Sequence, residues 1–215
     1  MLIHPWDAAQ DDTEWQSWLA GHDFGHLAVN GPPGTPPLVQ PTHFAYDGER
    51  QEVLVHLARP NPIWPAIEAH PEVLLSVADD YVFVPGPWMA ADGTPPEHGV
   101  PTSFYAAVQL SCTAHLVDDP HAKAALLTRQ LAHFQPEGGS APVAAAQEPY
   151  GSALSGIRGV RLEVTGVRAK FKYGNHKSEW TRQRTADALT SRGAPRDAQA
   201  RAHQVRRGAW EPTTS

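Results

Sequence analysis

Proline and glycine interrupt this chain so often that they limit the folds open to it. The 215 residues include 21 prolines and 17 glycines. Proline removes a backbone donor and glycine adds backbone freedom, so neither favours long, unbroken helices. The composition therefore indicates many loops and strands rather than a helical bundle. The length suits one domain, or one domain with an appendage.

Apolar runs between these breaks have the alternation and composition of β-strands. We expect strands over residues 24–29 and 159–171, and a strand-rich segment over residues 104–117. Residues 38–46, broken at Pro41, and residues 53–57 are expected to form a further pair of strands, because a turn sequence separates them. Together with the hairpin described in the next paragraph, this pattern predicts six or more short strands.

Two short apolar segments, residues 73–78 and 81–84, flank Asp79-Asp80 and predict a hairpin. Helices are fewer than strands. They are expected after a cap at Asp12-Thr13, as a turn over 65–70, and over 118–133, 181–191 and 195–207. The fold class is mainly β (α+β): an antiparallel barrel with peripheral helices and a C-terminal helical pair, not an alternating βαβ sheet.

Charge is distributed unevenly along the chain. The net charge is -6, yet residues 158–215 carry 13 basic side chains against 5 acidic ones. One interpretation is a C-terminal surface for anions or nucleic acid. The other is a solvated pair of helices, or a basic tail that packs on an acidic neighbouring subunit.

No feature of the sequence indicates a secreted or membrane-spanning protein. The N-terminal segment lacks a basic region followed by an apolar one, and no apolar window approaches the length of a membrane helix. Cys112 is the only cysteine, so the chain cannot form an internal disulfide. A cytoplasmic location is expected.

Common cofactor motifs are missing from this sequence. It has no glycine-rich dinucleotide fingerprint, no P-loop, no nucleophile elbow and no cysteine pair for zinc. The twelve histidines are scattered, and we expect no metal site among them. A phosphate site must therefore be built from side chains.

Three segments combine cationic or polar groups with aromatic ones: 55–64, 100–105 and 170–175. A planar anionic ligand needs this pairing, with aromatic surface for a ring and Arg, Lys or Thr donors for a phosphate. Arg59 is interpreted either as a phosphate ligand or as half of a surface ion pair. Trp88 either covers a ring or anchors its loop.

Read in order, these segments resemble the PaiB-type FMN-binding regulators of the flavin split-barrel superfamily. The most specific piece is His-Leu-Ala-Arg-x-Asn-Pro-x-Trp at 56–64, followed by Val-Pro-Thr at 100–102 and Lys-Phe-Lys at 170–172. The resemblance implies an FMN-binding split β-barrel, antiparallel and Greek-key-like, over residues 1–176. Residues 177–215 would form a helical extension on the barrel or on a partner subunit. Such barrels are usually homodimers with FMN between the subunits.

The resemblance also implies which residues contact the flavin. The cofactor-binding set is Thr42, His43, His56, Arg59, Asn61, Trp88, Thr102, Lys170, Lys172 and Asn175. The chain departs from the family pattern at 103–105 and 173–177, which implies an altered flavin site. No side chain stands out as a catalytic acid or base.

The resemblance leaves the role of the flavin open. If the protein is an enzyme, it is an FMN-dependent oxidoreductase. If not, it is a flavin-linked transcriptional regulator. The alternative is an apo or haem-binding barrel that serves as an interaction protein or as a DNA-binding repressor.

Overall fold

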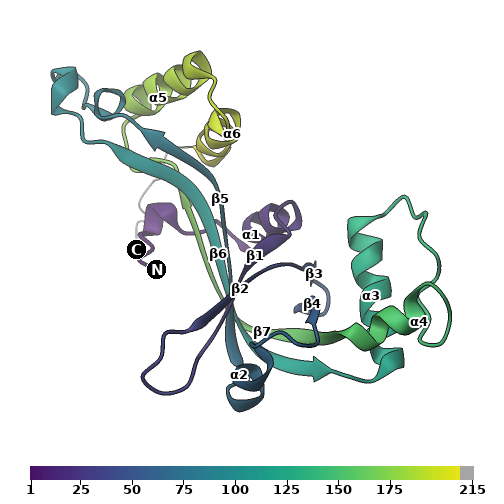
Figure 1. The fold of residues 1–215 in the computed structure, drawn as a ribbon. Coiled ribbons are helices and arrows are strands. Elements are labelled where there is room, and N and C mark those ends of the chain that lie inside the picture. Colours follow the sequence, from purple (N-terminus) through teal and green to yellow (C-terminus); the bar gives the residue numbers. More distant parts are fainter. Residues whose placement is uncertain (209–215) are drawn as a thin grey trace. The chain divides into compact units, whose positions relative to one another are not determined.

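The computed structural model describes residues 1–208, whose strands form one seven-stranded sheet in the order β2-β1-β5-β6-β7-β4-β3 (Figure 1). The strands are β1 Phe24–Val29, β2 Leu38–His43, β3 Ala45–Asp47, β4 Glu52–Ala58, β5 Glu72–Val84, β6 Thr102–Val117 and β7 Ile157–Lys172. The helices are α1 Asp12–Ala20, α2 Trp64–Ala69, α3 Pro120–Phe134, α4 Tyr150–Ala153, α5 Glu179–Arg192 and α6 Asp197–Arg207. Short 3-10 turns lie at η1 Pro5–Asp7, η2 Gly86–Met89, η3 Pro96–His98 and η4 Leu154–Gly156.

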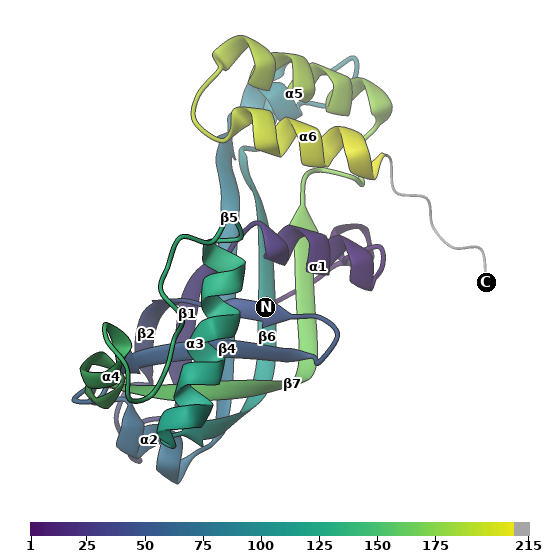
Figure 2. The same ribbon diagram turned by 90° about the vertical axis from the view of Figure 1, so that its right-hand side faces the viewer.

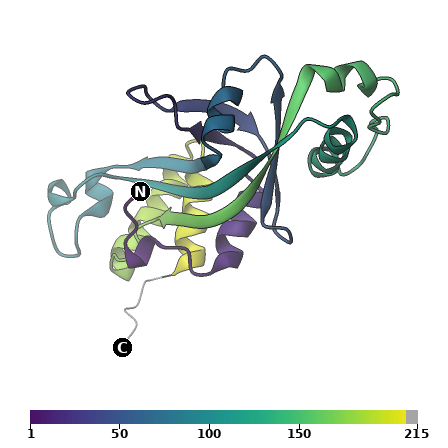
Figure 3. The same ribbon diagram turned by 90° about the horizontal axis from the view of Figure 1, so that it is seen from below.

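The three long strands β5, β6 and β7 are neighbours in the sheet and contribute to two compact units (Figure 3). Unit 1 comprises residues 1–15, 78–108 and 168–208. Unit 2 comprises residues 16–77 and 109–167. Within residues 1–208, every helix is too short or too polar to span a bilayer.

Unit 2 contains the four short strands and helices α2, α3 and α4. Strand β1 pairs antiparallel with β2 and β5, and β4 pairs antiparallel with β3 and β7. Helix α3 begins at a Pro after Asp119, whose side chain accepts a hydrogen bond from Ala122 N. The helix lies against β3 and β4 and buries Leu126 with Ala45 and Leu54 (Figure 2).

Unit 1 contains the C-terminal helices and the other halves of the long strands. Helix α5 packs on α6 and on η2. Ser178 caps the start of α5, and Gly193 ends it with a positive φ of 60°. Fully buried aromatic side chains form the centre of this unit: Phe104, Phe171 and Tyr173.

Most of the predicted elements are confirmed. Residues 24–29 form β1 as expected, and the strands predicted over 104–117 and 159–171 are β6 and β7. The helices predicted over 118–133, 181–191 and 195–207 are α3, α5 and α6. The helix expected after Asp12-Thr13 is α1, which buries Trp15, Trp18 and Leu19.

The predicted hairpin at Asp79-Asp80 is wrong, because β5 continues as one strand of 13 residues. Asp80 has a positive φ of 55°, yet the strand does not reverse there. Its carboxylate is buried and lies 2.9 Å from Nε2 of His203 on α6. His203 therefore provides a partner for a carboxylate that the local sequence had placed in a solvent-exposed turn.

Three further expectations are corrected. Residues 38–46 do not pair with β4 as a whole: β2 pairs with β1, and only β3 pairs with β4. The expected break at Pro41 is also wrong: β2 runs through Pro41, and the break comes at Phe44, whose amide donates to Asp23 O at 2.8 Å. The strands are also not all short, since β6 and β7 have 16 residues each.

Tyr173 provides a stability prediction for unit 1. Its ring stacks on His203 at 4.6 Å, and its buried hydroxyl has no hydrogen-bond partner among the described residues. An unsatisfied buried hydroxyl costs about 1 kcal/mol or more. Tyr173→Phe should therefore raise the free energy of unfolding by about 1 kcal/mol, measured by urea denaturation. Tyr81→Phe, on an exposed tyrosine, is the matched control and should change little. A less stable Tyr173→Phe protein would show that the hydroxyl is hydrogen-bonded after all.

Candidate functional site

The ten residues of the predicted flavin set fall into two groups, one in each unit. The histidine group lies in unit 2 and consists of Thr42, His43, His56, Arg59 and Asn61. The lysine group lies in unit 1 and consists of Trp88, Thr102, Lys170, Lys172 and Asn175.

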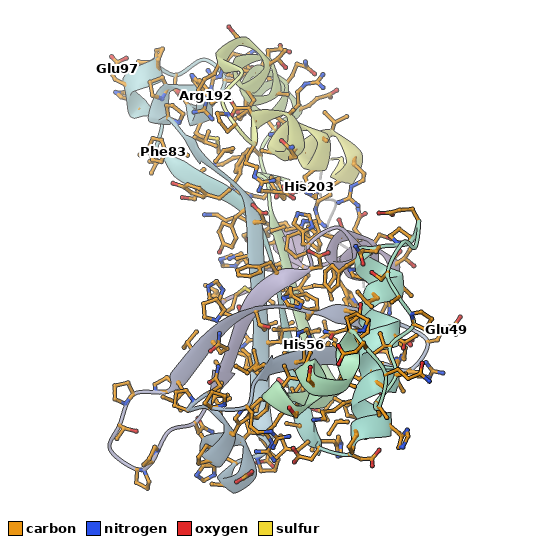
Figure 4. The ribbon with its side chains drawn as sticks, turned by 45° about the vertical axis from the view of Figure 1, so that its right-hand side comes forward. Glu49, His56, Phe83, Glu97, Arg192 and His203 are labelled. Atoms are coloured by element: carbon orange, nitrogen blue, oxygen red, sulfur yellow. The ribbon has the colours of Figure 1, made fainter. Side chains whose placement is uncertain are left out.

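The histidine group is centred on two imidazole rings at the ends of β2 and β4. The rings of His43 and His56 lie 5.1 Å apart, edge to face. Nδ1 of His56 lies 2.7 Å from Oε1 of Gln130 on α3, while Nε2 of Gln130 donates to Leu54 O at 2.9 Å (Figure 4). Because the Gln130 oxygen can only accept, Nδ1 of His56 carries the proton of this bond.

His43 is the more accessible of the two histidines. Burial, followed by the nearby His56, holds the pKa of His43 below its ordinary value of 6.5. Phe134 also packs edge-on against His43 at 5.2 Å. The imidazole of His43 is therefore favoured in its neutral form at neutral pH.

A lowered histidine pKa makes stability depend on pH. The folded state binds fewer protons at His43 than the unfolded state, so the free energy of unfolding falls as the pH drops below about 6.5. His43→Gln removes this contribution, and the variant should lose less stability than the parent between about pH 7 and pH 5. Urea unfolding at several pH values measures the difference. His121→Gln, on an exposed histidine of α3, should follow the parent curve. Equal pH dependence for His43→Gln and the parent would contradict the assignment.

Arg59 follows β4 and is fixed by its own chain. Its Nε donates to Ser155 O at 2.9 Å and its Nη2 to Ile157 O at 3.3 Å. Its Nη1 lies 3.5 Å from Asp118, and both side chains are about half exposed. The surface ion pair is therefore present. A guanidinium has five N–H groups, so others remain for a ligand.

The two polar neighbours of this group are engaged locally. Nδ2 of Asn61 donates to Oε1 of Gln40 at 2.9 Å, and its Oδ1 accepts from Ile63 N. Thr42 is buried, and its hydroxyl donates to His43 O at 3.0 Å. Both residues shape the backbone that carries His43 and Arg59.

Within the lysine group, Thr102 and Lys172 come together at a pocket. Nζ of Lys172 donates to Oγ1 of Thr102 at 3.0 Å. The pocket has a volume of about 180 Å³ and lies wholly in unit 1. Its lining is Met89, Val100, Pro101, Thr102, Phe104, Lys172, Gly174, His176 and Lys177.

Lys170 points to different partners although it lies only two residues from Lys172. Its ammonium is buried, donates to Leu2 O at 2.8 Å and lies 3.8 Å from Asp7. Burial raises the pKa of Asp7, and the charge of Lys170 acts in the opposite direction. Lys170 thus fastens the N-terminal segment to β7.

Trp88 and Asn175 also hold the chain of unit 1. The guanidinium of Arg192 lies 4.9 Å from the centre of the Trp88 ring, and the Trp88 carbonyl accepts from Thr185 Oγ1 at 3.1 Å. Asn175 is buried, and its Nδ2 donates to Gly208 O at 2.9 Å. In unit 1, Trp88 anchors its loop.

Sequence reasoning missed some residues that the structure brings to these groups. Gln130 and Phe134 reach the histidines from α3, and no local motif marks them. Gly174, His176 and Lys177 line the pocket of the lysine group. The departure from the family pattern over 173–177 was the available signal for these three.

The basic C-terminal segment uses most of its arginines internally. Of the seven arginines between positions 182 and 207, six bond to backbone carbonyls or carboxylates of unit 1, and Arg201 is exposed. The six are Arg182, Arg184, Arg192, Arg196, Arg206 and Arg207. Arg192, for example, donates to Phe83 O at 2.9 Å (Figure 4). Carboxylates pair with four of the six and offset part of the positive charge of this segment.

Comparison with solved structures defines the class of fold. The FAD and heme binding protein from Mycobacterium smegmatis has a TM-score of 0.60 and 18% identity, over 78% of this chain and 74% of that one. The flavocytochrome Anf3 from Azotobacter vinelandii has a TM-score of 0.59 and 20% identity, over 79% of this chain and 71% of that one. The fold is therefore a flavin split barrel, as the sequence predicted.

The family follows from the sequence itself. The model of the family described as "Putative FMN-binding domain" matches residues 1–166. The chain belongs to this family, and its cofactor is FMN. A search among curated proteins finds no match.

The residues present fit this cofactor. Arg59 retains free N–H groups, Lys172 has donors beyond its bond to Thr102, and His43 offers a ring at the sheet surface. None of the ten predicted residues is acidic. The donor set suits a planar ring system with a phosphate group.

Proposed function

We propose that this protein is a cytoplasmic, PaiB-type homodimer that binds FMN between its subunits and acts as a flavin-linked oxidoreductase. Residues 1–176 form the FMN-binding segment, and residues 177–208 belong to its helical extension; the last seven positions of the extension expected over 177–215 lie outside the described residues. Membership of the FMN-binding family is the observation that carries the proposal.

An uncovered face of the sheet in unit 2 supports the dimer. The register of β1 and β2 places Phe24 opposite His43, and Ala28 opposite Val39. Phe24 is 60% exposed and Val39 54% exposed. Apolar side chains gathered on one exposed face are typical of a protein interface. Since His43 shares this face, a partner that covers it would also exclude water from the flavin.

FMN supplies hydride or electron transfer when it is bound. The chain would hold and orient it. Arg59 and Asn61 are assigned to the phosphate, and His43 and His56 to the ring. Thr102 and Lys172 are assigned to polar atoms of the flavin. In a dimer these two groups need not come from the same chain. No side chain is assigned as a proton donor or acceptor in the reaction.

Two observations favour an oxidoreductase over a DNA-binding repressor. Six of the seven C-terminal arginines are bonded within unit 1, and the carboxylates that pair with four of them offset part of the positive charge available to phosphates. The net charge of -6 also opposes binding to a polyanion.

The visible absorbance spectrum of freshly purified protein is the decisive test. We expect a flavin spectrum, release of FMN on denaturation as identified by mass spectrometry, and a dimer by sedimentation. Reduction of the bound flavin by NADH or NADPH would support the oxidoreductase role. A colourless protein that takes up no added FMN would contradict the proposal and would favour the alternative of a barrel without a flavin cofactor.

A further inference from the structure

The pocket of the lysine group has a strongly cationic lining that the flavin assignment does not fully use. Lys172, His176 and Lys177 line it, together with the hydroxyl of Thr102. Among the described residues, no carboxylate lines this pocket. Its volume of about 180 Å³ is well below the roughly 300 Å³ at which drug-sized ligands begin to fit. The pocket can hold a small anionic group but not an isoalloxazine ring.

Several donors in this pocket are not engaged. Neither Lys172 nor Lys177 forms an ion pair with a carboxylate of the described residues. The ammonium of Lys172 has three N–H groups, and one of them is directed to Thr102. Because the Thr102 oxygen accepts that bond, its own proton is free to be donated. A ligand with acceptor oxygens would satisfy these groups together.

Glycine at position 174 makes the pocket possible. Gly174 has a positive φ of 74°, and a Cβ there would lie 3.1 Å from Cζ of Phe104. The turn that follows is closed by a hydrogen bond of 3.0 Å from Lys177 N to Gly174 O, which returns Lys177 toward Lys172. The local sequence that departs from the family pattern therefore builds one wall of this pocket.

The charges around His176 favour a bound anion. Burial, followed by Lys177, lowers the pKa of His176; His4 and Lys172 act in the same direction. Asp7 opposes them, but it is buried and lies beside Lys170. The Trp6 ring packs against His176 at 5.1 Å. An anion among these cations would make the protonated form of His176 more favourable.

We propose that this pocket binds the phosphate or carboxylate group of a small molecule other than FMN. Lys177 and His176 are its recognition residues, and Lys172 and Thr102 are shared with the flavin. We therefore assign the substrate of the oxidoreductase to small molecules that carry a phosphate or carboxylate group. That last step rests on the proposed function, whereas the binding of the anion does not.

The test uses inorganic phosphate as the probe and the ring signals of His176 in NMR as the readout. The His176→Gln variant assigns those signals. The pKa of His176 is measured with phosphate and with chloride at equal ionic strength, in apo and in FMN-saturated protein. We expect phosphate to raise this pKa in both forms. Lys177→Gln should weaken phosphate binding about tenfold or more, while Arg201→Gln, on an exposed arginine of α6, should not.

Three results would overturn the proposal. The first is the absence of any phosphate response in the parent protein, which needs no variant. The second is an equal response in Lys177→Gln and the parent. The third is a rise in the His176 pKa that phosphate causes in apo protein but not in FMN-saturated protein, because the pocket would then hold the phosphate of FMN. Failure to bind FMN is seen separately in the flavin spectrum and would contradict the proposed function alone.

Discussion

Glu14→Gln is expected to lower the free energy of unfolding by about 3 kcal/mol, because it leaves a buried arginine without its carboxylate. The side chains of Glu14 and Arg207 are both almost fully buried and form an ion pair. Arg206 lies 3.0 Å from the other Glu14 oxygen. Arg207 also donates to Ala8 O at 2.7 Å, so some of its donors stay satisfied in the variant. The expected loss therefore lies at the lower end of the range for broken buried pairs.

Urea denaturation followed by circular dichroism measures this loss. Glu49→Gln is the matched control, because Glu49 is exposed in the turn between β3 and β4 and makes the same change of charge. Amide exchange should also rise in α6, since the pair ties α1 to its last turn. A loss in Glu14→Gln no larger than in the control would show that water screens the pair.

The second large effect concerns FMN affinity. A hydrogen bond to a charged group contributes roughly 1.5–3 kcal/mol, so removing two cations should weaken FMN binding about 100-fold or more. Arg59→Ala and Lys172→Ala are each expected to weaken it, and the double variant most. Quenching of FMN fluorescence on titration with apo protein gives the dissociation constants.

Controls for this prediction come from each unit. Arg50→Ala removes an exposed cation from unit 2, and Arg201→Ala removes one from unit 1. Because Arg59 also holds the carbonyls of Ser155 and Ile157, the thermal stability of its variant must be measured too. If affinity is unchanged in both Arg59→Ala and Lys172→Ala, the assignment of these groups to the flavin is wrong. A loss in only one variant would show that only that cation contacts FMN.

Local sequence predicted those elements whose stability depends on local patterns. Strand β1 coincides with its predicted range, because buried and exposed side chains alternate along it. Helix α3 begins at Pro120, close to its predicted start at residue 118, because Asp119 caps its first turn. The hairpin prediction is wrong at Asp80. Adjacent aspartates are typical of a turn, but here the Asp80 carboxylate lies within a strand and contacts His203, 123 positions away.

Lys170 and Lys172 show which properties of this protein depend on its sequence and which depend on its tertiary structure. The sequence by itself determined the family, the cofactor class and the presence of two lysines at the end of a strand. These properties depend on the identity and order of residues. Which lysine is free to meet a ligand was decided by the tertiary structure alone. Lys170 is bonded to Leu2, 168 positions away, and Lys172 to Thr102, 70 positions away. Only folding brings such distant partners together, and the partner sets whether an ammonium group is buried in the chain or available to an anion.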